Sequence, residues 1–574
     1  MSDSAICERH PQPPLKFIDE DFVPDSFDKI NQIMQQMLSA TPSSINEWQD
    51  WVQWRSELDS VIAEESLKRM YASVCKTNDL ELEKSHLEFQ TEIMPLVQPV
   101  VDLLDRKYLD CEYRDQLRVA GLEVYDRSLE LGVKLFRQEN VSLKADDEKL
   151  SNEYTRLIGA MTVDYQGEEV TLAGMSKHLA SPEREVRKEA FTLVANRRLR
   201  NREDLDEVFD KMLNLRHQIG INAGFSNYRD YMHTAKERFD YTPQDCLEFG
   251  ENVKKYVVPA VKKINEHRRQ KLGLEKLRPW DTAVDLDSAP AFEPFTNSDE
   301  HVDVAAKLMS CVAEDFGQEL RWMNDQGLLD LDTRPHKGPG GFMDTLEKRR
   351  VPVIFANSGT THSDVETLVH EGGHALHSFF ARDLEPVDYR MSPLEFAEVA
   401  SMGLEALAME HLDEVYPANE IIRARRDSLE GMLSTFVWVA TIDGFQHWLY
   451  TNPEHTREQR TAAWLRILDE FSTGVDWSGY EDARAAMWHR QLHIFQVPFY
   501  YIEYAIAQMG SVQLWLNYRE NRAATVAAYR HGLSKGGSLR LPSLFEASGI
   551  KFDPQGNGLH EWVPAVISEW QKTV

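Results

Sequence analysis

Two histidines and a glutamate within five residues are the group in this sequence most suited to chemistry. His370, Glu371 and His374 form the pattern HExxH inside the stretch HEGGHALH. Histidines four positions apart on a helix lie on one face about one turn apart, so both imidazoles can bind a single metal ion. The glutamate is displaced around the helix, where a carboxylate can act as general base on the attacking water. We therefore predict a zinc site with ligands His370 and His374 and with Glu371 as the catalytic base.

A catalytic zinc site needs a third protein ligand and one position left for water. The segment SPLEFAEVASMGLE predicts a second helix, in which Glu398 is flanked by small and apolar residues. An unpaired carboxylate in such surroundings is costly to bury, and a cation opposite it removes that cost. Glu395 is explained by a capping box at the start of this helix, and Glu405 by a solvated face or by a hydrogen bond to a ligand histidine. We predict Glu398 as the third metal ligand.

The helix that carries the two histidines has its own start signal. Ser363 and Glu366 form an S-x-x-E capping box just before it. Gly372 and Gly373 oppose helix formation, since each glycine in a helix costs roughly 1 kcal/mol relative to alanine. We interpret them as positions where another element packs close to the helix backbone. Alanine at either position is expected to lower activity.

The remaining chain is dominated by helical patterns. Long segments with apolar residues at helical spacing run from about residue 27 to residue 274, which predicts a helical first half. Residues 277–295 are rich in Pro, Asp and aromatic residues and indicate irregular structure. Residues 334–361 combine clustered glycines with the short β-branched run VPVIFA. We predict a mainly α fold with a small β-sheet next to the active-site helix.

Charge and cysteine usage narrow the class of function. The 574 residues include 64 basic and 94 acidic side chains, which gives a net charge of −30. Such a surface repels phosphate backbones and anionic lipid heads. The five cysteines are scattered without a CxxC pair, which indicates neither a disulfide framework nor a cysteine zinc site. With no secretory leader and no apolar run of eighteen residues in the sequence, we expect a cytoplasmic protein without nucleic-acid or membrane partners and of unknown oligomeric state.

Several motifs in a fixed order resemble a known family. They are HEGGHALH followed by EFAEVASMGLE, together with LGLEKLRPWD, VPVIFANSGTTHSDVETLVHE, HIFQVPFYYIEYAIA and KGGSLRLPSLFEASGI. This combination resembles the oligoendopeptidase F branch of the M3 zinc metallopeptidases, relatives of thimet oligopeptidase, over roughly residues 214–574. The resemblance implies a mostly helical fold enclosing a deep substrate channel and one Zn²⁺ held by His370, His374 and Glu398. It also implies cleavage of internal bonds in short unstructured peptides.

The same resemblance gives roles to the segment MWHRQLHIFQVPFYYIEYAIA. In the family, a histidine and tyrosines from this region reach the metal and donate hydrogen bonds to the developing oxyanion. His493, Tyr500 and Tyr504 match these positions best. His489 and His493 are also four positions apart, but HRQLH lacks the adjacent glutamate and is the weaker candidate for a zinc site.

Alternatives to an endopeptidase stay open on the sequence. Zinc carboxypeptidases and dipeptidyl carboxypeptidases of similar helical fold share HExxH and a glutamate but trim peptides from the C-terminus. A non-catalytic peptide-binding helical protein is a further alternative, although a structural metal site has no use for an uncoordinated base. No GxSxG or Walker A motif supports a serine hydrolase or a P-loop enzyme. We expect an N-terminal helical region at residues 1–190, a catalytic domain at residues 191–574, and substrate binding by strand addition at the main-chain edge around VPVIFANSG.

Overall fold

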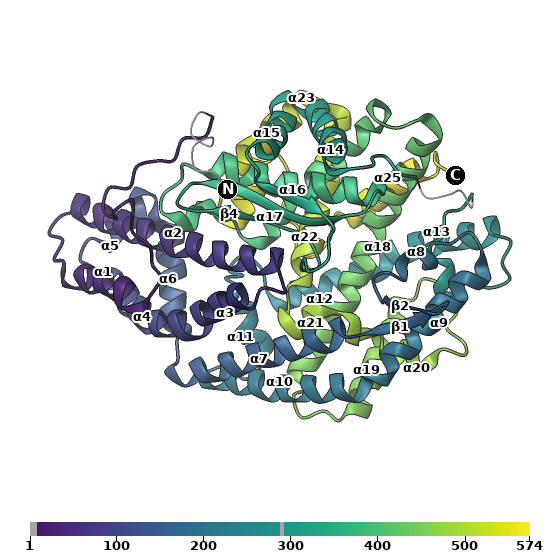
Figure 1. Ribbon diagram of the computed structural model, residues 1–574, viewed down its shortest axis with the longest axis horizontal. Helices are drawn as coiled ribbons and strands as arrows, with labels where there is room; N and C mark the ends of the chain where they lie inside the picture. The colour runs from purple at the N-terminus through teal and green to yellow at the C-terminus, as the bar shows by residue number, and fades with distance from the viewer. Residues whose placement is uncertain (1–8, 288–291) are drawn as a thin grey trace. The chain divides into compact units, whose positions relative to one another are not determined.

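Figure 1 shows a computed structural model that describes residues 9–287 and 292–574. The chain forms two compact units, each assembled from separate stretches of sequence. Unit 1 comprises Met1–Phe136, Phe292–Ala424 and Gly510–Phe552, and unit 2 comprises Arg137–Ala291, Arg425–Met509 and Asp553–Val574. Two long helices, α18 (Ala418–Thr451) and α22 (Tyr501–Glu520), carry the chain from one unit into the other. The predicted mainly α fold is confirmed, and the predicted division at residue 190 stays a prediction.

The first part of unit 1 is a group of helices with its own apolar core. Its elements are α1 (Phe27–Ser39), α2 (Ile45–Cys75), α3 (Leu80–Glu88), η1 (Phe89–Ile93), α4 (Met94–Leu109), α5 (Arg114–Leu117), η2 (Arg118–Leu122) and α6 (Glu123–Leu135). In α1, Ile30, Met34 and Met37 recur at helical spacing and are completely buried. They belong to the same core as Leu104 and Tyr108 of α4, so the amphipathic pattern in the sequence is what joins these helices.

A three-stranded sheet follows in the central part of unit 1. Its strands are β3 (Leu329–Asp332), β4 (Phe342–Leu346) and β5 (Val351–Ser358), in the order β3-β5-β4. β5 runs parallel to β3 and antiparallel to β4, and its continuous apolar run from Val351 to Ala356 is buried. The predicted strand VPVIFA is therefore confirmed. Because β5 is the middle strand, the outer edges belong to β3 and β4, which corrects the hypothesis of strand addition at VPVIFANSG.

Helices precede and follow this sheet in the central part of unit 1, and two of them carry the predicted zinc ligands. They are α14 (Ser298–Val312), α15 (Glu314–Asp325), α16 (His362–Ala381), η5 (Val387–Arg390), α17 (Leu394–Ala408) and η6 (Met409–Glu414). α16 packs on β4 and β5 and lies beside α17, with α14 also against it (Figure 1). The small β-sheet thus lies next to the helix that contains HExxH, as the sequence predicts.

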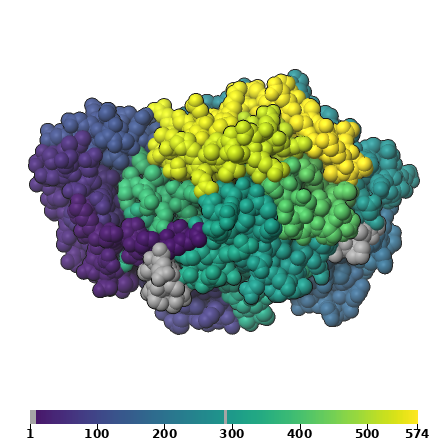
Figure 2. Space-filling view, turned by 90° about the horizontal axis from the view of Figure 1, so that it is seen from above, coloured from purple at the N-terminus to yellow at the C-terminus, as the bar shows by residue number. Residues whose placement is uncertain are grey.

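The third part of unit 1 packs against α17. It consists of the C-terminal half of α22, α23 (Arg522–Leu533) and α24 (Leu541–Ala547). Ser511 donates a hydrogen bond to the Met402 carbonyl at 2.7 Å, and Tyr529 donates to the Ala400 carbonyl at 2.5 Å. Residues 510–552 of unit 1, within the yellow-green to yellow part of the chain in Figure 2, therefore lie against the central part of the same unit.

Unit 2 is almost entirely helical. Its elements are α7 (Gln138–Gly159), the hairpin β1 (Thr162–Tyr165) and β2 (Glu168–Thr171), α8 (Ser176–Leu179), α9 (Arg184–Arg200), α10 (Arg202–Asn222), α11 (Tyr228–Ala235), α12 (Pro243–Asn252), η3 (Val253–Val257), α13 (Val258–Lys271), η4 (Pro279–Asp281), most of α18, α19 (Arg457–Glu470), α20 (Glu481–Ala485), η7 (Met487–Arg490), α21 (Leu492–Gln496), the start of α22, and α25 (Leu559–Trp570). Buried aromatic side chains, among them Phe209, Trp464 and Trp488, form part of its core. Among the described residues, no helix combines the length and the apolar character needed to cross a membrane.

Candidate active site

The start of α16 differs from the sequence-based expectation. The helix begins at His362, one residue before Ser363, and its capping box is formed by Thr361 and Asp364. Each of these side chains accepts a hydrogen bond from the backbone N–H of the other residue. The prediction of a box at Ser363 and Glu366 is therefore wrong by two residues. The cap still fixes the first turn of the helix that leads to HExxH.

The start of α17 also differs from the expectation. Its N-cap is Pro393, and no side chain makes a capping hydrogen bond there. Glu395 is buried at 4% exposure in the first turn, so the capping role inferred for it is wrong. The start of α17 is therefore not marked by a capping hydrogen bond from a side chain.

The three predicted metal ligands come together between α16 and α17. The Nε2 atoms of His370 and His374 lie 3.5 and 3.6 Å from one oxygen, Oε2 of Glu398. Zinc bonds of about 2.0–2.2 Å in a tetrahedron place neighbouring nitrogen and oxygen ligands about 3.3–3.6 Å apart. The donor set and its spacing therefore fit a zinc ion. The side chains of His370 and His374 keep 25% and 16% of their surface exposed, so the group is open to a further ligand.

A second carboxylate orients one of these histidines. His370 Nδ1 lies 2.5 Å from Glu405 Oε1, and a carboxylate can only accept, so Nδ1 carries a proton and Nε2 is the nitrogen that faces Glu398. Burial disfavours the charged imidazole, but the hydrogen bond and the charge of Glu405, with the charge of Glu398, raise the pKa of His370 to about 9. A metal ion that binds Nε2 therefore displaces a proton from that nitrogen. The hydrogen-bonding alternative considered for Glu405 is the one that the structure contains.

Glu371 lies beside the ligand group but is held from another side. The backbone N–H of Met343 in β4 donates a hydrogen bond to its carboxylate. Burial raises the pKa of Glu371 to about 7, since the opposing charge of His370 is partly offset by Glu398 and Glu405. A base with a pKa near neutrality can both take up and return a proton at physiological pH. The strand β4 thus positions a carboxylate suited to proton transfer.

The two glycines of HEGGH have different surroundings. A Cβ on Gly373 would lie 2.6 Å from both the Ala400 carbonyl oxygen and the Ser401 Cα of α17. A Cβ on Gly372 would meet only the Met309 Sδ and Cε atoms, at 3.0 Å. Close packing of another element at these glycines is thus observed, but only Gly373 faces backbone. It lets α17, and with it Glu398, approach the histidine helix.

His377 is not part of the ligand group. Its ring lies edge-on to Phe396 with centroids 5.7 Å apart. Its Nε2 is fully buried and has no hydrogen-bond partner in the described structure. Burial alone lowers its pKa to about 4, so the ring is neutral at physiological pH. The side chain therefore contributes to packing behind the site.

The remaining predicted site residues form a cluster of their own in unit 2. His493 in α21 has ring contacts with Tyr500 and Tyr504, at centroid distances of 5.6 and 6.0 Å. Burial, with a smaller contribution from Lys236, lowers the pKa of His493 to about 4. The neighbouring His489 is bound to Asp206 Oδ1 at 3.2 Å and buried, so the HRQLH segment does not assemble a metal site.

A chain of hydrogen bonds fixes the proton on His493, which sequence reasoning missed. Trp438 Nε1–H donates to Gln491 Oε1 at 2.9 Å. The amide nitrogen of Gln491 therefore faces His493 Nδ1, at 2.9 Å, and donates to it. Nδ1 is the acceptor, so the proton of the neutral ring is on Nε2. His493 is thereby set up as a hydrogen-bond donor.

The turn before α22 was also not foreseen. Phe499 adopts a left-handed backbone conformation with φ of 64°, which is unfavourable for a bulky residue. Its N–H donates to Gln446 Oε1 at 2.7 Å, and its carbonyl accepts from Arg238, which also pairs with Glu503 at 2.6 Å. These contacts hold a strained turn that sets the direction of Tyr500. Pro498 in the sequence signals a break, but not this geometry.

Comparison with known proteins identifies the family. The family model described as peptidase family M3 matches residues 177–561. The chain belongs to peptidase family M3. This M3 peptidase is 22% identical to the oligoendopeptidase F homolog of Borreliella burgdorferi over 452 residues, 74% of each chain. It is 25% identical to the chromosomal oligoendopeptidase F of Lactococcus lactis subsp. cremoris over 236 residues, which are 41% of this chain and 38% of that protein.

Solved structures agree with this assignment. PZ peptidase A, solved with an inhibitor, superposes with a TM-score of 0.90 at 26% identity, over 97% of this chain and 99% of that chain. The predicted resemblance to oligoendopeptidase F within the M3 metallopeptidases is therefore confirmed, and the M3 peptidase is a hydrolase of peptide bonds. The helical fold is likewise that of its structural neighbours.

Proposed function

We propose that this M3 peptidase is a zinc-dependent oligoendopeptidase that cleaves internal bonds of short, unstructured peptides. The observation that carries the proposal is the convergence of His370, His374 and Glu398 on one point with Glu371 beside them. Residues 191–574 are the proposed catalytic domain. When bound there, zinc supplies Lewis-acid chemistry, lowering the pKa of a water molecule and polarising the scissile carbonyl.

The side chains of the site have distinct proposed tasks. Glu371 takes a proton from the attacking water and returns it to the leaving amine, and the N–H of Met343 holds its carboxylate in place. Glu405 keeps the Nδ1 proton on His370 and so leaves Nε2 available to a metal. His493, with its proton on Nε2, and the hydroxyls of Tyr500 and Tyr504 are the proposed donors to the developing oxyanion.

The substrate class rests on the relatives and on the fold family. Proteins named oligoendopeptidase F recur among the relatives of this chain, which supports internal cleavage of oligopeptides. A deep channel is part of the proposal and would exclude folded proteins. Cys75, Cys111, Cys246 and Cys311, the cysteines that the structure describes, are outside disulfides, which supports the proposed cytoplasmic location.

The test compares three proteins on one substrate. An internally quenched short peptide with an amidated C-terminus is given to wild type, Glu371→Gln and the control Glu366→Gln, and the metal content of each protein is measured. Glu366 lies on the same helix as Glu371 and is more exposed, at 31% of its side chain. We expect zinc in all three proteins and cleavage by wild type and Glu366→Gln only.

Each other outcome contradicts a defined part of the proposal. If the amidated peptide is not cleaved, the same peptide with a free C-terminus is tested, and its cleavage would indicate a carboxypeptidase. Zinc without cleavage of any short peptide would favour a peptide-binding protein. Absence of metal from carefully purified wild type would remove the proposed ligand assignment.

A further inference from the structure

A second group of metal-ligating side chains lies within unit 2. Asp443 and His447 are four positions apart on α18 and therefore share one face of that helix. Cys246 of α12 completes the group, and one donor atom from each residue lies within 4.8 Å of the other two. Cys246, Asp443 and His447 are 3%, 2% and 5% exposed. A thiol, a carboxylate and an imidazole thus meet in the interior.

The polar atoms of this group are not satisfied by one another. Asp443 Oδ2 and His447 Nε2 are 3.2 Å apart. Asp443 Oδ1 and His447 Nδ1 are fully buried and have no hydrogen-bond partner. Leaving a buried donor or acceptor unpaired typically costs about 1–3 kcal/mol, and more for a charged group. The Asp443–His447 contact therefore satisfies one atom of each residue, and the second carboxylate oxygen and the second ring nitrogen are unpaired in the interior.

We propose that Cys246, Asp443 and His447 bind a divalent transition-metal ion of the zinc class, at a site distinct from the proposed catalytic one. Sulfur, nitrogen and oxygen donors together suit zinc, whereas calcium and magnesium take oxygen ligands. A thiolate and a carboxylate neutralise a divalent charge, which explains how Asp443 is tolerated in the interior without a neighbouring lysine or arginine salt bridge among the described pairs. The bound ion ties α12 to α18.

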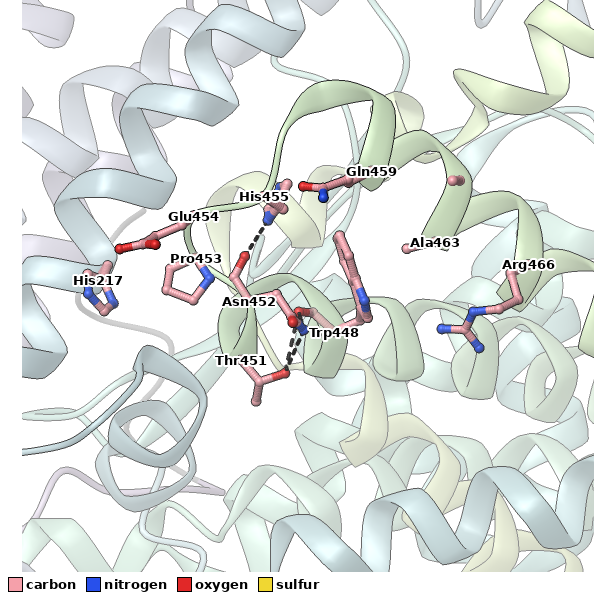
Figure 3. Close-up of a pocket in the computed structure, with 11 residues that line it drawn as sticks. His217, Trp448, Thr451, Asn452, Pro453, Glu454, His455, Gln459, Ala463 and Arg466 are labelled. Atoms are coloured by element: carbon pink, nitrogen blue, oxygen red, sulfur yellow. Dashed lines mark hydrogen bonds between the residues drawn. The ribbon is translucent and has the colours of Figure 1, made fainter.

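An opening beside the group gives the ion a route and a further ligand position. Cys246 and His447 line a cavity of about 280 Å³, together with Arg229, Glu251 and Lys254. Trp448, Thr451 and Arg466 line both this cavity and a larger one of about 720 Å³. Figure 3 shows the larger cavity, with Trp448 and Thr451 on the last turns of α18. A water molecule from the smaller cavity can supply the fourth ligand that zinc prefers.

Cobalt substitution of the full-length protein tests the site. Cobalt(II) bound by a thiolate gives a strong near-ultraviolet charge-transfer band, and the catalytic candidates, two histidines and a glutamate, contain no thiolate. The band therefore distinguishes the proposed Cys246 site from the proposed catalytic site. We expect the band in wild type and in the control Cys311→Ser, a half-buried cysteine of α14, and its loss in Cys246→Ser with one metal ion fewer per chain.

Further variants separate this proposal from the proposed function. Glu398→Ala should keep the band even where the catalytic metal is lost, so failure at one site does not imply failure at the other. His447→Gln should weaken cobalt binding at this site at least tenfold and serves as a second variant if Cys246→Ser does not fold. Absence of the band from cobalt-saturated wild type, or its persistence in Cys246→Ser, overturns the proposal.

Discussion

Alanine at Gly373 is the perturbation that most directly tests how the proposed zinc ligands are held. The new Cβ would lie 2.6 Å from the Ala400 oxygen and the Ser401 Cα. Ordinary van der Waals contact begins at 3.4 Å, so α17 has to retreat by about 0.8 Å. Glu398 lies less than one turn before Ser401 and moves with this backbone. Its Oε2 is only 3.5 and 3.6 Å from the two histidine Nε2 atoms.

The size of the effect follows from packing and from metal geometry. Overpacking of this kind typically costs about 1–3 kcal/mol, and metal–ligand distances are tolerated only within about 0.2 Å. If this cost reduces the free energy of zinc binding, the zinc affinity falls by about 10- to 100-fold, since each 1.4 kcal/mol is a factor of about ten. Peptide cleavage at limiting zinc falls with it.

Gly372→Ala is the matched control one residue away. Its Cβ would meet only the end of the flexible Met309 side chain at 3.0 Å, which can turn aside. Zinc affinity of both variants is measured by competition with a chromophoric chelator, and folding is checked by circular dichroism. We expect a few-fold change at most for Gly372→Ala. Wild-type affinity in a folded Gly373→Ala, or equal losses in both variants, would refute the reasoning.

Three further predictions concern other parts of the molecule. Glu405→Ala removes the acceptor of the His370 Nδ1 proton and should weaken zinc binding about 10- to 100-fold; unchanged affinity in the chelator assay would contradict this. Tyr500→Phe should lower kcat about 100- to 1000-fold with little change in KM if its hydroxyl stabilises the oxyanion, and steady-state kinetics that show a change in KM alone would exclude that role. Burial lowers the pKa of His301 below 6.5, against the opposing Asp364 carbonyl. Because the pKa of His301 is lower in the folded state than in the unfolded state, keeping the ring neutral contributes fully to stability above pH 6.5. This contribution to the free energy of unfolding is lost as the pH falls through the folded-state pKa, by at most about 1.4 kcal/mol per pH unit. In His301→Gln, the free energy of unfolding measured with urea should fall less steeply as the pH is lowered, and an unchanged dependence on pH would contradict this prediction.

The proposed metal ligands could be predicted because each is marked by a short stretch of sequence around it. Four-residue spacing places His370 and His374 on one helix face whatever surrounds them, and a carboxylate among apolar neighbours marks Glu398. The boundaries of the helices were harder to predict from the sequence than the ligands. Two overlapping patterns, T-x-x-D and S-x-x-E, compete at the start of α16, and β5 ends at Ser358, so the earlier cap is used. At α17, the capping box that the sequence suggested does not form.

Other features depend on contacts that no short motif encodes. The tautomer of His493 is set by Gln491, whose amide is oriented in turn by Trp438. Cys246 looks incidental in the sequence, since its partners Asp443 and His447 are far away along the chain. Only the folding of α12 against α18 brings the three together. Each unit is assembled from separate stretches of the chain, which also depends on long-range packing, and the helical periodicity of each segment does not reveal it.

Unit 1 is assembled from segments that are far apart along the chain, and this has a consequence for biosynthesis. Ala400 and Met402 of α17 are bound by Tyr529 and Ser511, which the ribosome adds more than a hundred residues later. While the chain is still being made, the helix with Glu398 lacks these partners, and the proposed zinc ligands cannot reach their final arrangement. The proposed active site of such a peptidase is completed only after Ser511 and Tyr529 have been made, so the part of the chain that precedes them is not exposed to a working active site of its own during synthesis.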